Sequence, residues 1–219
     1  MATGDPFTDE DFERIFDAVK VDEQELKDGW TQAKQMPGLT VWKFAEKSDP
    51  VRQLKGTMKF PGISLEDLFE MTNDPELRVK WDEPLQCMKV IESDIDGEWS
   101  ALYSVIKLPG PLIKRRDFVS ARGIRKEANR ILILLKPTTH PSAPEKPDFI
   151  RGDLNGAFIL QADKDDPNSS EVLFYSKTDL KGKLPMIAIN FVSTKAAVMT
   201  FESIPKFYAK EYSKRPKAN

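Results

Sequence analysis

The chain has very little of the chemistry that most enzymes need. It contains one histidine, His140, and one cysteine, Cys87, so a metal site built from several histidine and cysteine ligands is excluded. The glycine-rich nucleotide-binding patterns, the Gly-x-Ser-x-Gly nucleophile pattern and the His-Glu-x-x-His zinc pattern are missing. The segment from Glu92 resembles the first half of a calcium loop, but its last position holds Tyr103 instead of a bidentate glutamate. We therefore expect no catalytic residue, cofactor or metal.

Long hydrophobic runs and an excess of one charge are missing as well. The apolar run Ile131–Leu135 is enclosed by Arg130 and Lys136 and is far shorter than the ~18 residues that can span a bilayer. The amino terminus has no apolar signal core. The 33 basic and 35 acidic residues nearly cancel, leaving a net charge of −2, so there is no global basic field for nucleic acid. These absences predict a reduced, intracellular and soluble protein that does not bind nucleic acid.

Helical patterns lie near the two ends of the chain and once between them. Apolar residues recur at helical spacing from Thr8 over residues 8–35, and Pro37-Gly38 ends that region. Ser64 is a good N-cap for a second helix, which breaks near residues 73–75 into a short third one. Residues 185–212 are typical of a long helix, which Pro205 should kink or end near residues 202–204. Its predicted apolar stripe consists of Ile187, Phe191, Val198 and Phe201.

Strand-like runs fill most of the remaining chain. Two runs precede the second helix and six follow between Gln86 and Lys177, separated by short turn signals that favour an antiparallel meander. There is no linker, so residues 1–219 are predicted to form a single domain with a core of roughly 8–210. The element order predicts an α+β fold in which a strongly bent antiparallel sheet is covered by the long terminal helix. Such a cupped sheet can leave a cavity beneath that helix.

Alternation within two of these runs gives a candidate pocket. Phe118, Ser120, Arg122 and Ile124 share one face of their strand, and Trp99, Ala101, Tyr103 and Val105 share one face of theirs. If both faces line the interior, that interior is apolar with a few polar groups and one cation, which is typical of a small-molecule pocket. A buried Arg122 would have to meet a partner or a ligand oxygen, because burial of an isolated charge is too costly. The alternative is that Arg122 faces water or pairs with a structural carboxylate.

The segment Leu108–Arg116 combines a Pro-Gly-Pro turn, apolar residues and three consecutive basic residues. A basic cluster of this kind can contact nucleic acid, or it can form a solvated strand edge. The shortness of the run favours the solvated edge.

Four segments in order along the chain resemble one known family, the StAR-related lipid-transfer (START) domain. They are "LRVKWDE" (77–83), "RRDFVSARG" (115–123), "HPSAPEKPDFIRG" (140–152) and "TDLKGKLP" (178–185). The resemblance extends over roughly residues 8–210 and is greatest to the small single-domain sterol carriers. It implies a helix-grip fold, in which a bent antiparallel sheet of about nine strands is closed by a long C-terminal helix around a lipid tunnel.

The resemblance also implies a set of ligand-binding residues. Arg122 matches an arginine that meets the ligand hydroxyl in sterol carriers, although its usual acidic partner falls at Tyr103. Tyr103 and Phe118 match two aromatic positions of the choline cage in phosphatidylcholine carriers, and the third falls near Asn155. Arg78 matches a contact to phosphate or other ligand oxygens. The full predicted set is Arg78, Trp81, Trp99, Tyr103, Phe118, Ser120, Arg122, Asn155, Ile187 and Phe191.

In the same comparison the segment 108–116 lies at the tunnel mouth, opposite the C-terminal helix. Apolar Leu112 and Ile113 would then touch acyl chains, with Leu108 in the same gate, while Lys114 and Arg115 would hold anionic headgroups. The implied function is non-enzymatic transfer of one lipid by a cytoplasmic monomer, peripheral to membranes, that touches them transiently. A sterol is the first cargo expected and a phospholipid the second. A lipid sensor acting through a protein partner and an enzyme on a related helix-grip scaffold are the alternatives.

Overall fold

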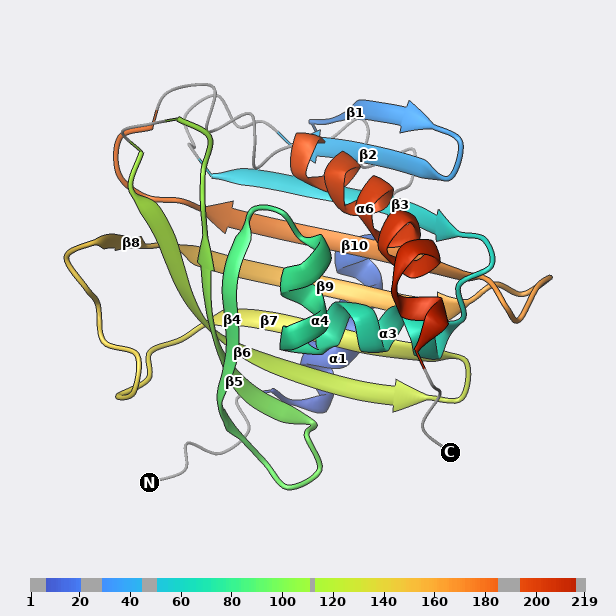
Figure 1. Ribbon diagram of the computed structural model, residues 1–219, viewed down its shortest axis with the longest axis horizontal. Helices are drawn as coiled ribbons and strands as arrows, with labels where there is room; N and C mark the ends of the chain where they lie inside the picture. Colours follow the sequence, from blue (N-terminus) through green and yellow to red (C-terminus); the bar gives the residue numbers. More distant parts are fainter. Residues whose placement is uncertain (1–6, 21–28, 45–50, 111–112, 185–193, 216–219) are drawn as a thin grey trace.

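The computed structural model describes residues 7–20, 29–44, 51–110, 113–184 and 194–215 (Figure 1). Its α-helices are α1 (Asp9–Val19), α3 (Leu65–Asn73), α4 (Pro75–Trp81) and α6 (Ala196–Lys210), and the short 3₁₀ helix η2 (Tyr212–Lys214) follows α6. None of the helices in these ranges is long and apolar enough to cross a bilayer.

Ten strands form one sheet. They are β1 (Trp30–Met36), β2 (Leu39–Phe44), β3 (Arg52–Phe60), β4 (Leu85–Ser93), β5 (Trp99–Ile106), β6 (Arg115–Glu127), β7 (Arg130–Pro137), β8 (Phe149–Arg151), β9 (Asp153–Ala162) and β10 (Ser170–Asp179). Their order is β1-β2-β3-β10-β9-β7-β6-β5-β4, with antiparallel neighbours, and β8 adds to β6 as a parallel strand. The predicted α+β architecture, a bent antiparallel sheet of about nine strands with a C-terminal helix, is confirmed.

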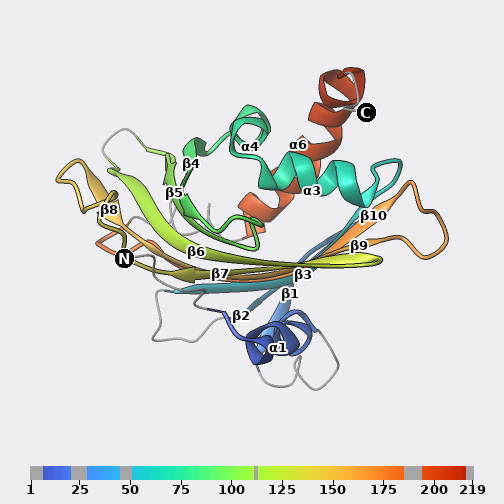
Figure 2. The same cartoon turned by 90° about the horizontal axis from the view of Figure 1, so that it is seen from below.

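The sheet separates two layers of helix. Seen along its edge in Figure 2, the sheet is curved, with α3, α4 and α6 on the concave side and α1 on the convex side. The N-cap Thr8 begins α1 with a capping box to Asp11, and Ser64 and Asp74 cap α3 and α4. These caps satisfy backbone N–H groups that have no partner inside the helix. The predicted helix starts at Thr8 and Ser64 are therefore confirmed.

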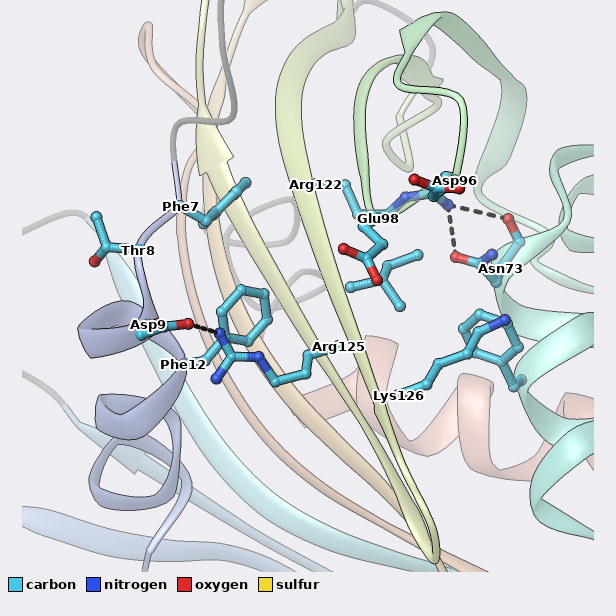
Figure 3. Close-up of a pocket in the computed structure, with 13 residues that line it drawn as sticks. Phe7, Thr8, Asp9, Phe12, Asn73, Asp96, Glu98, Arg122, Arg125 and Lys126 are labelled. Carbon is cyan, nitrogen blue, oxygen red and sulfur yellow. Dashed lines mark hydrogen bonds and ion pairs between the residues drawn. The ribbon is translucent and has the colours of Figure 1, made fainter.

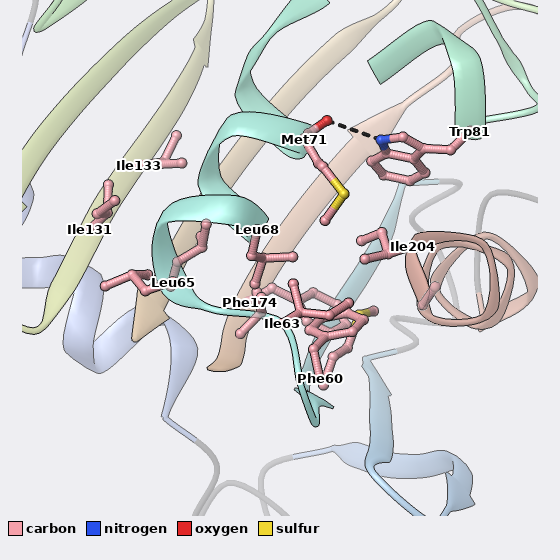
Figure 4. Packing of buried hydrophobic residues seen from close by; sticks show 14 of the residues in the cluster. Phe60, Ile63, Leu65, Leu68, Met71, Trp81, Ile131, Ile133, Phe174 and Ile204 are labelled. Atoms are coloured by element: carbon pink, nitrogen blue, oxygen red, sulfur yellow. Dashed lines mark hydrogen bonds between the residues drawn. The ribbon is translucent and has the colours of Figure 1, made fainter. Parts of the chain in front are cut away.

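Each face of the sheet has its own apolar core. On the convex face, Phe12, Ile15 and Val19 of α1 pack on side chains of β5, β6, β7 and β9. On the concave face a larger cluster joins β2, β3, β7, β9 and β10 to α3, α4 and α6 (Figure 4), through residues that include Phe60, Leu68, Met71, Trp81, Ile133, Phe174 and Ile204. A third, smaller cluster of Leu108, Phe118 and Leu180 lies beside the loop between β5 and β6. Burial on both faces fixes the register of the central strands.

Two predictions about secondary structure were wrong. Residues 30–36 form the edge strand β1, paired with β2, and not the end of the first helix. The β1–β2 hairpin overrides the helical spacing because its turn at Gly38 has a positive φ of 77°. At the other end, α6 continues through Pro205 to Lys210, so of the two predicted effects of Pro205, a kink or an end near residues 202–204, the end is wrong. Burial of Ile204 and Phe207 stabilises both sides of the proline, which removes only one backbone donor.

The C-terminal half of α6 is fastened to α3 by polar side chains. The hydroxyl of Tyr208 donates to Asp67 at 3.0 Å, and that of Tyr212, in η2, donates to Glu70 at 2.7 Å. Arg215 also pairs with Glu70 at 3.1 Å. Burial and the Glu70 carboxylate raise the pKa of Tyr212 well above its usual range, so the phenol stays a donor. These bonds hold one end of α6 over the concave face.

A buried ion pair fastens β8 and the loop before it. Arg151 donates to both oxygens of Asp117, at 3.0 and 2.8 Å, and to the carbonyl oxygen of Ala143 at 3.1 Å. The Asp117 side chain is 1% exposed and that of Arg151 13%. The pKa of Arg151 is raised, chiefly by its hydrogen bond to Asp117.

We predict that Arg151→Met lowers the free energy of unfolding by about 3 kcal/mol, because it leaves the Asp117 carboxylate buried without a cation. Denaturant unfolding would measure the loss. Arg14→Met is the control, since the pair of Arg14 with Glu10 is exposed and should contribute less than about 1 kcal/mol. Similar losses in both variants would show that the buried pair is not structurally important.

Candidate functional site

A row of residues on the concave face crosses five neighbouring strands. Ser100 of β5 lies opposite Arg122 of β6, which lies opposite Leu135 of β7; Leu135 lies opposite Gly156 of β9, and Gly156 opposite Ser176 of β10. The row runs between the large concave cluster and the small cluster near the β5–β6 loop. Leu135 and Ser176 are only half-buried by the described residues. We call this row the floor of the candidate site.

Arg122 is the cation of this floor, and its exposure is only 7%. Its Nε donates to the Ser100 hydroxyl at 2.9 Å, and its Nη1 donates to the Asn73 side-chain oxygen at 2.6 Å and to the Asn73 carbonyl oxygen at 3.3 Å. All of these acceptors are neutral. Among the described residues no carboxylate forms an ion pair with Arg122. Burial lowers the pKa of the Arg122 guanidinium to about 10, so keeping this group charged in the folded protein is energetically unfavourable.

Two further predicted residues share the face of Arg122. Ser120 is buried on this face, 5% exposed. Phe118 packs against Leu108 and Leu180. The expected face of Phe118, Ser120 and Arg122 is therefore the concave one.

Trp99 and Tyr103 do not lie on that face, so the prediction that both strand faces line one interior was wrong. Trp99 pairs with Gly123 and packs in the convex core with Phe12. Tyr103 follows the same alternation, and its ring lies 5.7 Å from the Lys146 ammonium. Burial, and next the negative charge of Asp117, raise the pKa of Tyr103. The pairing brings Ser100 beside Arg122, so the concave residues of β5 are those between the predicted ones.

Asn155 is also on the convex face, because it alternates with Ala157 and Ile159 of the convex core. The choline-cage positions implied by the resemblance are thus split, with Phe118 on one face and Tyr103 and Asn155 on the other. These side chains do not converge on one ligand in this sheet.

Arg78 and Trp81 lie on α4, above the concave face. Arg78 is paired with Asp82, with Nε and Nη2 at 2.9 and 2.8 Å from the same oxygen, and its guanidinium lies 4.4 Å over the Trp81 ring. Trp81 donates its indole N–H to the Met71 carbonyl oxygen at 3.0 Å inside the core (Figure 4). These contacts give both residues a structural role, and their predicted ligand contact remains a prediction.

The loop between β5 and β6 only partly matches the predicted gate. Leu108 is 1% exposed and packs in the small concave cluster, so its side chain is a core residue and not an exposed part of the gate. Lys114 and Arg115 are exposed; Lys114 donates to the Pro147 carbonyl oxygen and Arg115 lies over the Phe149 ring. Ile113 is half-buried. Leu112, Ile187 and Phe191 lie outside the described residues.

The structure adds two residues that the sequence did not point to, Ser100 and Asn73, which hold Arg122. It also places Arg122 beside a hollow with a volume of about 550 Å³, which lies between the start of α1, the end of α3 and the turn Asp96–Glu98 (Figure 3). The sequence held one signal for Ser100: it follows Trp99 directly, so its side chain points to the opposite face of the strand. Asn73 had no signal, since α3 approaches β6 only in the folded chain.

We predict that Arg122→Met leaves the free energy of unfolding of the lipid-free protein within about 1 kcal/mol of its original value, because lost hydrogen bonds are offset by removal of an unneutralised buried charge. Denaturant unfolding beside Arg151→Met would measure the difference. A loss of about 3 kcal/mol or more would make Arg122 a structural residue, contrary to its assignment to the floor.

Comparison with known proteins gives this geometry a context. The START domain family model matches residues 19–209. Steroidogenic acute regulatory protein, mitochondrial, of Danio rerio is 27% identical over 179 residues, which are 80% of this chain and 61% of that protein. Human START domain-containing protein 10 is 25% identical over 192 residues, 84% of this chain and 64% of that protein. The chain thus spans about three fifths of the length of these relatives.

Solved structures show the same fold. The crystal structure of human STARD10 matches with a TM-score of 0.77 at 22% identity, covering 94% of this chain and 84% of that chain. Human StAR-related lipid transfer protein 5 matches with a TM-score of 0.73 at 21% identity, covering 94% and 100%. The helix-grip fold and the family resemblance carried by the four segments are both confirmed. With a family model that matches nearly its whole length, the chain belongs to the START domain family.

Proposed function

We propose that this protein is a non-enzymatic carrier of one lipid molecule, held on the concave face with its polar end at Arg122. The observation that carries the proposal is the floor itself, a row of small and apolar side chains that contains, next to Ser100 at one end, a buried arginine whose partners are all neutral. Covering an apolar molecule with such a surface is worth ~25 cal/mol for each Å² removed from water. The names of the relatives, which include a lipid transfer protein, support this proposal.

The cargo is proposed to be a sterol-type lipid first and a phospholipid second. One relative is named for steroidogenesis. The separation of Tyr103 and Asn155 from Phe118 argues against a choline cage at these positions. Either cargo would have its apolar part along Leu135, Gly156 and Ser176 and its polar part near Arg122 and Ser120.

Chemical conversion of the cargo is not part of the proposal. The floor from Ser100 to Ser176 contains no histidine and no carboxylate. A general acid or base has to lie within hydrogen-bond reach of the reacting group. A hydroxyl and a guanidinium that remains charged near neutral pH suit binding better than proton transfer.

For delivery, we propose transient docking on anionic membranes through Lys114 and Arg115, by a cytoplasmic monomer. Both side chains are exposed beside the loop that carries Ile113. Each cation near an anionic bilayer surface contributes about 1 kcal/mol.

We predict that the protein, incubated with a cellular lipid extract and then freed of excess lipid, retains one lipid for each chain. Native mass spectrometry would give both the stoichiometry and the mass of the lipid. Recovery of a chemically altered lipid would contradict the carrier function. Failure to retain any lipid would contradict the proposal as a whole.

We further predict that the double variant Lys114→Glu/Arg115→Glu binds vesicles containing phosphatidylserine at least about tenfold more weakly at low salt, with a smaller difference at high salt, because salt screens exposed charges. Vesicle co-sedimentation would measure it. The control is Lys59→Glu/Lys164→Glu, which changes the net charge equally at the other end of the sheet, by the β9–β10 turn (Figure 1). Equal weakening in both variants would rule out a local docking site.

A further inference from the structure

Strand β6 extends further than its neighbour β5, so part of its edge has no strand beside it. The pairing of β5 with β6 begins at Trp99 opposite Gly123, whereas β6 runs on to Glu127 beside β7. The last backbone bond on the β5 side comes from the Ile124 N–H, which donates to the Glu98 carbonyl oxygen at 2.7 Å. Beyond this bond none of the described strands lies along that edge of β6 (Figure 1).

The backbone groups of Lys126 point toward this open edge. In an antiparallel sheet the N–H and C=O of successive residues point alternately to the strands on either side. Glu127 is the last residue before the two-residue turn to β7, so Glu127 and Arg125 bond to β7. Ile124 and Lys126 alternate with them and therefore face the β5 side, in agreement with the bond from Ile124. The N–H and C=O of Lys126 can thus pair with an additional strand.

The open edge borders the hollow between α1, α3 and the β4–β5 turn. The hollow has a volume of about 550 Å³, and its lining includes Ile124, Arg125 and Lys126 but no residue of β7 (Figure 3). Pockets of roughly 300–1,000 Å³ are typical of ligand sites. The start of α1 contributes Phe12 from the convex side of the sheet, and α3 contributes Phe69 from the concave side. A strand added to β6 would therefore lie between two helices, in what we call the edge slot.

The side chains along the edge slot determine which peptide suits it. Lys126 is exposed on the concave face, with its ammonium 5.2 Å from the centre of the Phe69 ring, and no carboxylate of the described residues forms an ion pair with it. On the convex face Arg125 is already paired with Asp9 and lies 4.3 Å over the Phe12 ring. A strand residue opposite Lys126 has its side chain on the same face, where a carboxylate is favoured. The residues next to it point toward the apolar Phe12 side.

We propose that the edge slot binds an extended acidic segment of a partner protein, which adds to β6 as an antiparallel strand. An aspartate or glutamate of that segment lies opposite Lys126 and exchanges two backbone hydrogen bonds with it, and the residues on either side are apolar. Asp96 and Glu98 lie on the turn at the β5 end of the slot and repel further carboxylates there. The acidic residue is therefore confined to the position opposite Lys126. This protein-binding site is separate from the floor and does not depend on the cargo.

Synthetic peptides test the backbone pairing and the charge separately. The probe is the acetylated and amidated pentapeptide Thr-Val-Glu-Val-Thr, titrated into the isotope-labelled protein and followed by amide chemical shifts. Replacing its glutamate by lysine should weaken binding at least about tenfold. Methylation of the glutamate nitrogen removes the donor to the Lys126 carbonyl oxygen and should also weaken binding at least about tenfold. Methylation of the following valine nitrogen is the matched control, because that N–H points away from β6, and should weaken binding less than about threefold.

Two variants of the protein locate the site on β6. Lys126→Glu should weaken binding of the glutamate peptide at least about tenfold and reverse the preference, so that the lysine peptide binds more tightly. Lys164→Glu makes the same charge change on the exposed turn between β9 and β10 and should leave both affinities within about twofold. Bound peptide should also slow hydrogen exchange of the Lys126 amide, while the Arg125 amide, already bonded to β7, should change less. Circular dichroism and thermal unfolding would show that each variant is folded.

Several results would overturn the proposal. Equal affinities of the glutamate and lysine peptides would exclude selection of an acidic segment. Binding that survives methylation of the glutamate nitrogen would exclude strand addition, and equal losses in Lys126→Glu and Lys164→Glu would place the peptide elsewhere. No detectable binding of the glutamate peptide at about 1 mM, a concentration at which even weak complexes form, would exclude the site altogether. Lipid retention is measured independently by mass spectrometry, so failure of the peptide site and failure of the carrier function are distinguishable.

Discussion

Strict alternation of side chains along strands that are buried on both faces is the constraint on which the site depends. In β6, Asp117, Val119 and Ala121 point to the convex face, where α1 and the Asp117–Arg151 pair require them. The residues between them, among them Ser120 and Arg122, must then point to the concave face. A shift of one residue would bury Arg122 beneath α1 and expose the convex core. The position of the cation is therefore fixed by packing on the opposite side of the sheet.

The buried arginines show how one residue type serves different purposes in the same sheet. Arg151 and Arg116 tie loops to strands, because each has its donors filled by a carboxylate or by backbone carbonyl oxygens. Arg122 is held in place by neutral groups and retains unused donor capacity. A buried charge in that condition destabilises the fold unless something binds it. The contrast separates a candidate binding residue from structural ones within a single sheet.

Polar side chains link the helices on the concave face to one another and to Arg122. The last turns of α6 and the following η2 are joined to α3 by Tyr208 and Tyr212. The same α3 ends at Asn73, which holds Arg122. One short helix thus connects the C-terminal cover to the polar end of the floor. A ligand that changes the surroundings of Arg122 would act on the element that anchors the cover.

Apart from the edge strand β1, the sequence alone determined the order of the main elements, the helix starts at Thr8 and Ser64 and the bent antiparallel sheet, because caps, turn residues and apolar spacing are local signals. The family was indicated by the four resembling segments. The sequence also placed Phe118, Ser120 and Arg122 on one face. Only the tertiary structure decided that Trp99, Tyr103 and Asn155 belong to the other face, and that Leu108 is core. Alternation defines two faces of a strand but does not say which one a distant helix covers. The partners of Arg122, Ser100 and Asn73, likewise depend on strand register and on the approach of α3, which no single segment encodes.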